Sequence, residues 1–386
     1  MFGVFCGSIT MQDREAYIVL NMIDGLGPVS VRRLVERLGT PKAILEADRD
    51  TLMEAHGVGE KMALKIIVQR DQLDPETEIN KAADEGARII TQLDDEYPEA
   101  LKSIHDPPLA LYVRGSLLPS DAKALGIVGS RSTSHYGLSA ADRLAYQLAQ
   151  TGFTVVSGLA RGTDTAAHSG ALKGKGRTIA VLGGAIDCLY PPENDGLAAK
   201  IANHGAVISE YPMGRQVDRM TFPYRNRIIS GLSMGVLLIE STVKGGSMHT
   251  IDAAMEQGRT VFALPGRIDM PGARGPHRLI KNGAKLVESL DDILEEFEFL
   301  IPEAERQAPA AETAARPDVP LTEAETKIVE ALWGEALDVD SLARAVGMKS
   351  YELSGLLLGL EMKRVVCMRP GRMVELADDL RTGFRS

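Results

Sequence analysis

The feature that most constrains the fold is a regular alternation of short apolar runs, glycine-rich turns and amphipathic segments between residues 124 and 264. Apolar runs separated by segments of helix length indicate parallel strands joined by crossover helices. The expected strands are residues 88–91, 109–113, 124–128, 154–157, 178–182, 206–209, 235–240 and 260–264. We therefore predict an α/β fold with a doubly wound parallel sheet, whose functional loops follow the carboxyl ends of the strands.

The first turn of this series, Gly129-Ser130-Arg131, indicates a phosphate site. It separates an apolar run from an amphipathic helix expected between Tyr136 and Ala149. A dinucleotide fingerprint requires Gly-x-Gly-x-x-Gly and a later acidic residue, and that spacing is absent here. Turn amides and a helix N-terminus attract anions, and the Arg131 guanidinium adds a planar charged fork. The turn is therefore predicted to bind a phosphate rather than a dinucleotide.

A second cluster follows the strand at residues 154–157. Ser157 and Gly158 allow a ligand to approach the backbone, Arg161 is expected at the mouth of the site, and Asp164 is expected to order the turn. His168 lies four residues after Asp164 on the same helix face, so the favoured interpretation is a structural Asp–His hydrogen bond. No nucleophile stands with them in a three-part catalytic arrangement.

Residues 219–227 combine guanidinium groups with aromatic rings, a combination that suits the phosphates and bases of single-stranded nucleic acid. The predicted contacts are Arg219, Phe222, Arg225, Asn226 and Arg227. In the competing interpretation, Arg225 and Arg227 pair with Glu210 or Glu240 at the top of the sheet, and we expect one of the two arginines to do so.

Two further glycine-rich turns complete the candidate site. Gly183 and Gly184 follow a strand and permit a close approach, whereas Gly246, Ser247 and Thr250 precede a helix and predict a second anion-binding N-terminus. Pro265 and Gly266 end the last strand. The sequence contains no carboxylate pair, Cys/His metal spacing or Walker motif. We therefore expect no catalytic residue, no metal and no cofactor.

Charge and cysteine content are compatible with this prediction. The net charge is −10, yet residues 125–290 contain 18 Lys and Arg against 12 Asp and Glu, so a basic centre lies between acidic ends. Such a distribution suits a local polyanion site. The cysteines at positions 6, 188 and 367 are odd in number and widely spaced, which predicts no disulfide framework and a reducing cytoplasm. We see no signal peptide and no membrane-spanning run, so no membrane contact is expected.

Smaller domains are expected on both sides of the sheet. Residues 1–74 are predicted to be helical, with Gly25-Leu26-Gly27 and Gly57-Val58-Gly59 as hairpins of a SAM-like helix-hairpin-helix pair. These glycines either cap helices or let hairpin amides contact a DNA backbone. Residues 75–300 form the sheet domain. Residues 301–320 are rich in Ala, Pro and Glu, which predicts a flexible linker.

Residues 321–386 are predicted to form a winged-helix domain. Thr322 and Glu325 form a capping box that opens the first of three helices, and a β-hairpin follows the third helix at residues 350–362. That third helix offers acidic residues and leucines where a DNA reader needs Arg, Lys, Asn or Gln. Protein contact or plain packing is therefore favoured over DNA reading.

Taken in order, these segments resemble the bacterial DNA-processing protein A family (DprA, also called Smf). The matching segments are residues 129–131, 157–164 with His168, 182–187 with Tyr190 and Pro191, 209–210, 222–227, 245–247 with Thr250, and 265–266. The chain departs from the family pattern at Thr163, where the family usually has Ile, and at Gly245, Met248 and His249.

The resemblance implies an extended Rossmann-like core that binds single-stranded DNA and has no enzymatic activity. Family members shield strands that enter during natural transformation, load RecA recombinase onto them and dimerise through this core. The predicted DNA-binding residues are Gly129, Ser130, Arg131, Ser157, Gly158, Arg161, Gly183, Gly184, Arg219, Phe222, Arg225, Asn226, Arg227, Gly246, Ser247 and Thr250. The predicted site-ordering residues are Asp164, His168, Glu210, Glu240, Pro265 and Gly266.

Two other classes of protein are alternatives. A nucleoside-phosphate phosphoribohydrolase uses a similar sheet with a Pro-Gly-Gly-x-Gly-Thr loop followed by Glu, of which only Pro265-Gly266 is present here. A scaffold that binds only proteins through its terminal domains is the third interpretation. Binding of oligo-dT, measured beside the release of base from a nucleotide, separates the three.

Overall fold

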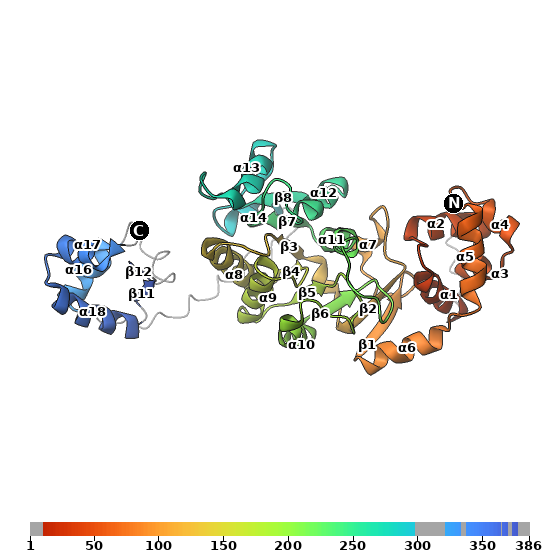
Figure 1. Cartoon of the computed structure of the whole chain (residues 1–386), viewed down its shortest axis with the longest axis horizontal. Coiled ribbons are helices and arrows are strands. Elements are labelled where there is room, and N and C mark those ends of the chain that lie inside the picture. The colour runs from red at the N-terminus through yellow and green to blue at the C-terminus, as the bar shows by residue number, and fades with distance from the viewer. Residues whose placement is uncertain (1–10, 298–320, 333–336, 364, 370–372, 377–386) are drawn as a thin grey trace. The chain divides into compact units, whose positions relative to one another are not determined.

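The computed structural model describes residues 11–297, 321–332, 337–363, 365–369 and 373–376 (Figure 1). The expected linker at residues 301–320 lies outside these ranges. The chain divides into two compact units, Met1–Pro302 and Glu303–Ser386. Within the described residues, no helix is both long enough and apolar enough to cross a membrane.

The first unit contains a nine-stranded sheet with the order β1-β2-β6-β5-β4-β3-β7-β8-β9. The strands are β1 Ala87–Thr91, β2 Ala110–Gly115, β3 Ala124–Val128, β4 Thr154–Ser157, β5 Thr178–Val181, β6 Ala206–Ser209, β7 Gly235–Leu238, β8 Thr260–Ala263 and β9 Lys285–Leu286. From β6 to β9 every neighbouring pair is parallel, which confirms the doubly wound core.

One edge of the sheet is antiparallel, a detail that the prediction of a parallel core did not specify. β2 pairs antiparallel with both β1 and β6. The segment between β1 and β2 contains only the four-residue helix α7 (Glu99–Lys102), which is too short for the crossover that parallel neighbours need. At the other edge the structure adds β9, which the sequence pattern did not indicate because it is only two residues long.

Helices cover both faces of the sheet, as a doubly wound fold requires (Figure 1). They are α6 Pro75–Asp84, α7, α8 His135–Gln150, α9 Thr163–Lys173, α10 Asp195–His204, α11 Thr221–Leu232, α12 Met248–Glu256, α13 Arg274–Lys281 and α14 Asp291–Phe297. Short 3-10 turns lie at Pro119–Ala122, Pro192–Asn194 and Pro271–Ala273.

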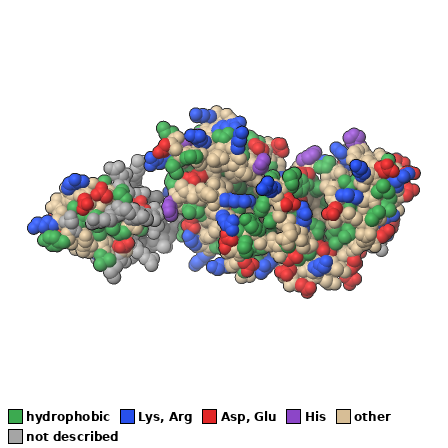
Figure 2. Space-filling model, in the orientation of Figure 1, with side chains coloured by type: hydrophobic (Ala, Val, Ile, Leu, Met, Phe, Trp, Pro, Cys, Tyr) green, Lys and Arg blue, Asp and Glu red, His purple; other side chains and the backbone are tan. Residues whose placement is uncertain are grey.

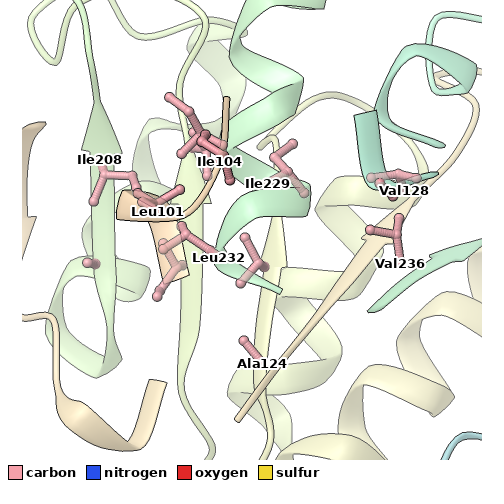
Figure 3. Packing of buried hydrophobic residues seen from close by; sticks show 14 of the residues in the cluster. Leu101, Ile104, Ala124, Val128, Ile208, Ile229, Leu232 and Val236 are labelled. Atoms are coloured by element: carbon pink, nitrogen blue, oxygen red, sulfur yellow. The ribbon is translucent and has the colours of Figure 1, made fainter. Parts of the chain in front are cut away.

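Alternate residues of each central strand enter two different cores. From β3, Ala124 and Val128 pack with residues of α7, α11 and α12, including Leu101, Ile229 and Leu232 (Figure 3). Leu125 and Ile127 point to the opposite face and pack with residues of α8, α9 and α14. A strand buried on both faces must be apolar throughout, which explains why its sequence shows no polar alternation.

The first unit begins with a bundle of short helices: α1 Met11–Met22, α2 Pro28–Leu38, α3 Pro41–Glu46, α4 Arg49–Met53 and α5 Glu60–Arg70. Gly27 and Gly59 are the N-caps of α2 and α5, and Gly25 and Gly57 adopt positive φ angles of 76° and 85°. The glycines therefore meet the geometric needs of two hairpins. Ile18 of α1 also packs with sheet residues such as Ile89, so the bundle and the sheet share apolar contacts.

The second unit has the predicted winged-helix elements. They are α16 Glu323–Ala331, β10 Leu337–Asp338, α17 Val339–Val346, α18 Ser350–Met362, β11 Val366–Arg369 and β12 Met373–Leu376. The capping box is confirmed, because Thr322 Oγ1 accepts a bond from the Glu325 amide and Glu325 accepts one from the Thr322 amide. The additional strand β10 pairs with β12, so the sheet has the order β10-β12-β11.

Candidate nucleic-acid interface

A cleft of about 500 Å³ lies at the carboxyl edge of the sheet, between the loops that follow β3 and β7. After β3 the chain builds β4, β5 and β6 on one side, then returns to place β7 on the other side of β3. Such a switch point is where open α/β sheets bind ligands. Figure 2 shows Lys and Arg side chains beside a hollow in the surface of the first unit. The cleft lining includes ten predicted DNA contacts: Gly129, Ser130, Arg131, Arg219, Phe222, Arg225, Asn226, Gly246, Ser247 and Thr250.

The rim of the cleft, which we define as Arg131, Arg219 and Phe222, combines exposed positive charge with an aromatic ring. Both arginines are exposed, and in the described part of the chain neither has an ion pair or side-chain hydrogen bond. The Arg131 guanidinium lies over the Phe222 ring, 4.7 Å from its centroid. The ring thus orients one cation, and both charges remain available to a ligand.

The floor of the cleft, which we define as Arg225, Asn226 and Asp164, is buried. Arg225 is 3% exposed and donates a 2.9 Å hydrogen bond to the carbonyl of Gly158. Burial lowers the pKa of Arg225 to about 10, and nearby Asp164 opposes that shift. Asp164 accepts hydrogen bonds from the amides of Gly158 and Ala160, which agrees with the ordering role predicted for it. Burial also raises the pKa of Asp164.

Glu240 determines the shape of the turn after β3. Its carboxylate accepts hydrogen bonds from the Ser134 amide at 2.8 Å, the Ser134 hydroxyl at 2.5 Å and the Thr133 hydroxyl at 2.8 Å. Ser134 in turn caps α8 by accepting a bond from the Gly137 amide. These hydrogen bonds agree with the ordering role predicted for Glu240. However, Glu240 already accepts the hydrogen bond of the Ser134 amide at the start of α8. That amide is therefore not available to the phosphate that the sequence predicts there.

Tight backbone contacts fix the position of the turn after β3. A Cβ atom at Gly129 would lie 2.4 Å from Thr163 Oγ1, and one at Gly162 would lie 2.5 Å from the Ser130 carbonyl. The Thr163 amide also donates to that carbonyl. Only glycine allows the two loops to approach this closely, so the Arg131 backbone has a defined position.

Arg227 is a correction to the predicted DNA contacts. Its guanidinium donates two 2.7 Å bonds to the carboxylate of Glu210 and also pairs with Asp106 at 2.8 Å. Arg227 and Glu210 are 6% and 7% exposed. Although burial disfavours the charge, Glu210 raises the pKa of Arg227 above its usual value. The expectation that one of the two arginines pairs with a carboxylate is confirmed, and Arg227 belongs to the frame of the site.

The predicted hydrogen bond between Asp164 and His168 is not formed. His168 is fully buried, and its Nδ1 lies 2.7 Å from Thr178 Oγ1. The Thr178 hydroxyl donates to the Val155 carbonyl, so it must accept from His168 Nδ1–H, which leaves Nε2 as a buried acceptor without a partner. Burial lowers the pKa of His168 to about 3. His168 therefore joins α9 to the sheet as a neutral side chain.

Four predicted contacts support the cleft from behind instead of lining it. The Ser157 hydroxyl is buried and donates to the Ile127 carbonyl. Cβ atoms at Gly158, Gly183 and Gly184 would lie 2.5 Å from Arg225 Nη2, 2.8 Å from the Phe222 ring and 2.8 Å from Val217. The close approach that we expected from a ligand is made by other parts of the protein.

Arg161 does not line the cleft, although Ala160, the residue before it in the same loop, does. Pro265 and Gly266 line a smaller neighbouring pocket with Ser134 and Tyr136. The Tyr136 hydroxyl donates to the Pro265 carbonyl at 2.8 Å, so the segment after β8 is attached to the start of α8. This contact agrees with the ordering role predicted for Pro265 and Gly266.

The structure adds cleft residues that sequence reasoning did not select: Ser132, Ser241, Thr242 and His249. Ser241 and Thr242 lie in the loop that follows β7, three and four positions after its last residue, so the rule for carboxyl ends of strands could have found them. The described residues contain no group of three His, Cys, Asp or Glu side chains that could hold a metal ion.

Comparisons with known proteins agree with this architecture. Residues 88–298, more than half of the chain, match the family model described as DNA recombination-mediator protein A. Residues 17–71 match a SAM-like helix-hairpin-helix tandem, and residues 312–372 match a DprA winged helix domain. The chain belongs to the DprA/Smf family.

Relatives within the DprA/Smf family match most of the chain. Protein Smf from a Synechocystis species is 35% identical, with 93% of this chain and 98% of that protein covered. DNA processing protein DprA from Streptococcus pneumoniae has a solved structure with a TM-score of 0.66 and 36% identity, which covers 75% of this chain and 99% of that one. A structure that describes the single-stranded DNA-binding mode of the Helicobacter pylori protein has a TM-score of 0.50 and 28% identity, with coverages of 56% and 98%.

Proposed function

We propose that the cleft binds single-stranded DNA. The observation that carries this proposal is the rim at the switch point of the sheet, where two exposed arginines, neither of which has an ion pair among the described residues, line the cleft together with an aromatic ring. Guanidinium groups form charge-assisted hydrogen bonds with phosphates. The structural relative from Helicobacter pylori, described as binding single-stranded DNA, supports the same ligand.

In this proposal, Arg131 and Arg219 bind backbone phosphates, and the open loop at Gly246 receives the chain of the nucleic acid. Gly246 is exposed, and among the described residues beyond its chain neighbours no atom lies within 4 Å of the place where its Cβ would stand, so that backbone is accessible. The Phe222 ring is already in contact with Arg131 and Tyr190. A base therefore stacks on the rim formed by the ring and its guanidinium, which is a surface that only unpaired bases can reach.

We further propose that the protein has no enzymatic activity and acts by holding strands. It shields incoming strands from nucleases and loads RecA recombinase onto them during natural transformation, acting in the cytoplasm as a homodimer through the Rossmann-like domain. Family membership supports these roles. We also propose that residues 1–74, 75–300 and 321–386 are the functional domains. Faster assembly of RecA on oligo-dT in the presence of this protein, and a mass twice that of the chain in solution, are the expected results.

The direct test of DNA binding is a comparison of oligo-dT with a duplex of equal length. We expect the full-length protein to bind oligo-dT more tightly, with a strong dependence on salt concentration. Equal binding of both ligands would reject the single-strand proposal. Release of base from a nucleotide, measured in parallel, would favour the phosphoribohydrolase alternative.

A further inference from the structure

A row of alternating cations and rings leads out of the cleft. Arg131 lies over the Phe222 ring, and Phe222 contacts Tyr190 edge to face with ring centroids 5.9 Å apart. The Arg161 guanidinium lies 5.6 Å from the Tyr190 ring centroid and donates to the Tyr190 hydroxyl at 3.3 Å. The row therefore continues from the rim to a second arginine that is not part of the cleft lining.

Arg161 differs from the rim arginines because it forms an ion pair with a carboxylate. Its Nε and Nη2 atoms donate to the two carboxylate oxygens of Glu193, with 3.1 Å between Nη2 and Oε2. Both side chains are about half exposed, at 49% and 50%. Their hydrogen bonds lower the pKa of Glu193 and raise that of Arg161. A two-oxygen contact of this kind has the same geometry as the contact of an arginine with a phosphate.

The carboxylate is held in place by its neighbour in the chain. Asn194 is 7% exposed, and its amide donates 2.9 Å hydrogen bonds to the Leu159 carbonyl and to Thr165 Oγ1. These bonds connect the 3-10 turn Pro192–Asn194 to the loop that carries Arg161. The buried Asn194 therefore holds Glu193 next to Arg161. The exposed ion pair itself contributes little to the free energy of unfolding.

We propose that Arg161 and Tyr190 form a second subsite for single-stranded nucleic acid beyond the cleft, and that Glu193 occupies it until a backbone phosphate displaces the carboxylate. One phosphate binds the Arg161 guanidinium, and the adjoining base contacts the partly exposed Tyr190 ring. This inference rests on the proposed function. It adds a subsite that opens only when a strand long enough to leave the cleft is bound.

The experiment measures the affinity of full-length protein for oligo-dT of about 4 and about 15 nucleotides, which span the usual single-strand site sizes. Glu193→Gln removes the charge of the competing carboxylate. Glu96→Gln is the matched control, because Glu96 also forms an exposed pair with an arginine, Arg88, at 2.7 Å. We expect Glu193→Gln to increase affinity for the longer strand about fivefold at low salt, with no change for the shorter strand. Glu96→Gln should change neither affinity.

Arg161→Ala in both backgrounds identifies the source of the gain. We expect a loss of about twofold in the wild-type protein but about tenfold in Glu193→Gln, because only in the latter is Arg161 released from the competing carboxylate. Equal losses, or a Glu193→Gln variant that binds like Glu96→Gln, would overturn the second subsite. If the proposed function itself fails, the wild-type protein will not bind oligo-dT, and Arg131→Ala will have no effect. Unchanged melting temperatures exclude misfolding, and Arg161→Lys, which keeps the charge but loses the fork, provides an independent variant.

Discussion

The rim and the interior behind it use the same residue type in opposite ways. Arg131 and Arg219 are exposed, and the structure shows no ion pair for either in the described residues. Arg225 and Arg227, on helix α11, are buried and bound by a carbonyl and by two carboxylates, respectively. The difference shows that the partners of an arginine, rather than its presence in a motif, decide whether it can bind a ligand. We therefore expect rim substitutions to affect DNA binding and interior substitutions to affect stability.

The largest effect should come from breaking the interior pair. Glu210→Ala leaves the buried Arg227 with Asp106 as its remaining carboxylate partner. Loss of one member of a buried pair costs about 3–5 kcal/mol. Because Asp106 still neutralises part of the Arg227 charge, we expect a loss of about 3 kcal/mol. Urea unfolding should show this loss, with Glu96→Gln as an exposed-pair control. A Glu210→Ala variant as stable as the wild type would refute the structural role of the pair.

Arg131→Ala tests the rim. We expect oligo-dT binding to weaken by one to two orders of magnitude, because a charge-assisted contact contributes about 1.5–3 kcal/mol. The loss should be similar for all base compositions, and affinity should depend less steeply on salt. Titration by fluorescence anisotropy measures both quantities. An unchanged affinity in a variant that melts like the wild type would remove Arg131 from the site.

His168 makes the stability contributed by the interior depend on pH. Burial lowers the pKa of His168 to about 3 in the folded protein, below its ordinary value of about 6.5. The unfolded chain therefore binds more protons between these values, so stability falls as pH drops from about 6.5 toward 3. At pH 5 the loss should be about 2 kcal/mol relative to pH 7.

His168→Asn removes the ionisable group, and its amide nitrogen takes the place of Nδ1, so it can still donate to Thr178. Its free energy of unfolding should depend less on pH between 7 and 5 than that of the wild type. Asp164, whose pKa burial raises, is present in both proteins, so its contribution cancels. Identical pH profiles would show that His168 does not titrate in this way.

The smallest effect should follow removal of the residues after Leu300. The cleft lining lies entirely in the first unit, and the exposed face of α18 presents Tyr351 and Leu358 together with acidic Glu352 and Glu361. This face lacks the cations that a nucleic-acid reader needs. Oligo-dT affinity should stay within about threefold of the full chain, a difference under about 1 kcal/mol. Tight duplex binding by the isolated fragment 321–386 at physiological salt would contradict this view.

Local sequence patterns predicted most of the elements. The strands at residues 154–157 and 206–209 have the predicted bounds, because buried parallel strands are continuous apolar runs that end at polar or glycine residues. The capping box at Thr322 and the third helix at residues 350–362 were likewise predicted by local signals. The rule that ligands bind at the carboxyl ends of strands also placed the cleft correctly.

The partners of individual side chains could not be predicted in the same way. The sequence offered Glu210 or Glu240 as partners of Arg225 and Arg227 but did not decide between them, and it gave no sign of Asp106, which lies 121 positions from Arg227. Nor did it indicate that Glu240 reaches Ser134 across 106 positions. His168 could have bonded to Asp164 one helical turn away, yet its ring contacts Thr178 on a strand. Spacing along one element does not encode these contacts, because they depend on how separate elements pack.

The sequence alone therefore determined the order of elements, the apolar faces that form the core and the positions of the glycine-rich turns. These follow from local periodicity and backbone sterics, which depend on neighbouring residues. Only the tertiary structure decided which arginines remain free, which carboxylate holds the turn after β3, and why Gly183 faces Phe222. The burial and the ion pairs of these side chains depend on contacts between segments that are distant in the sequence. These contacts determine which charges of the cleft remain available to a ligand.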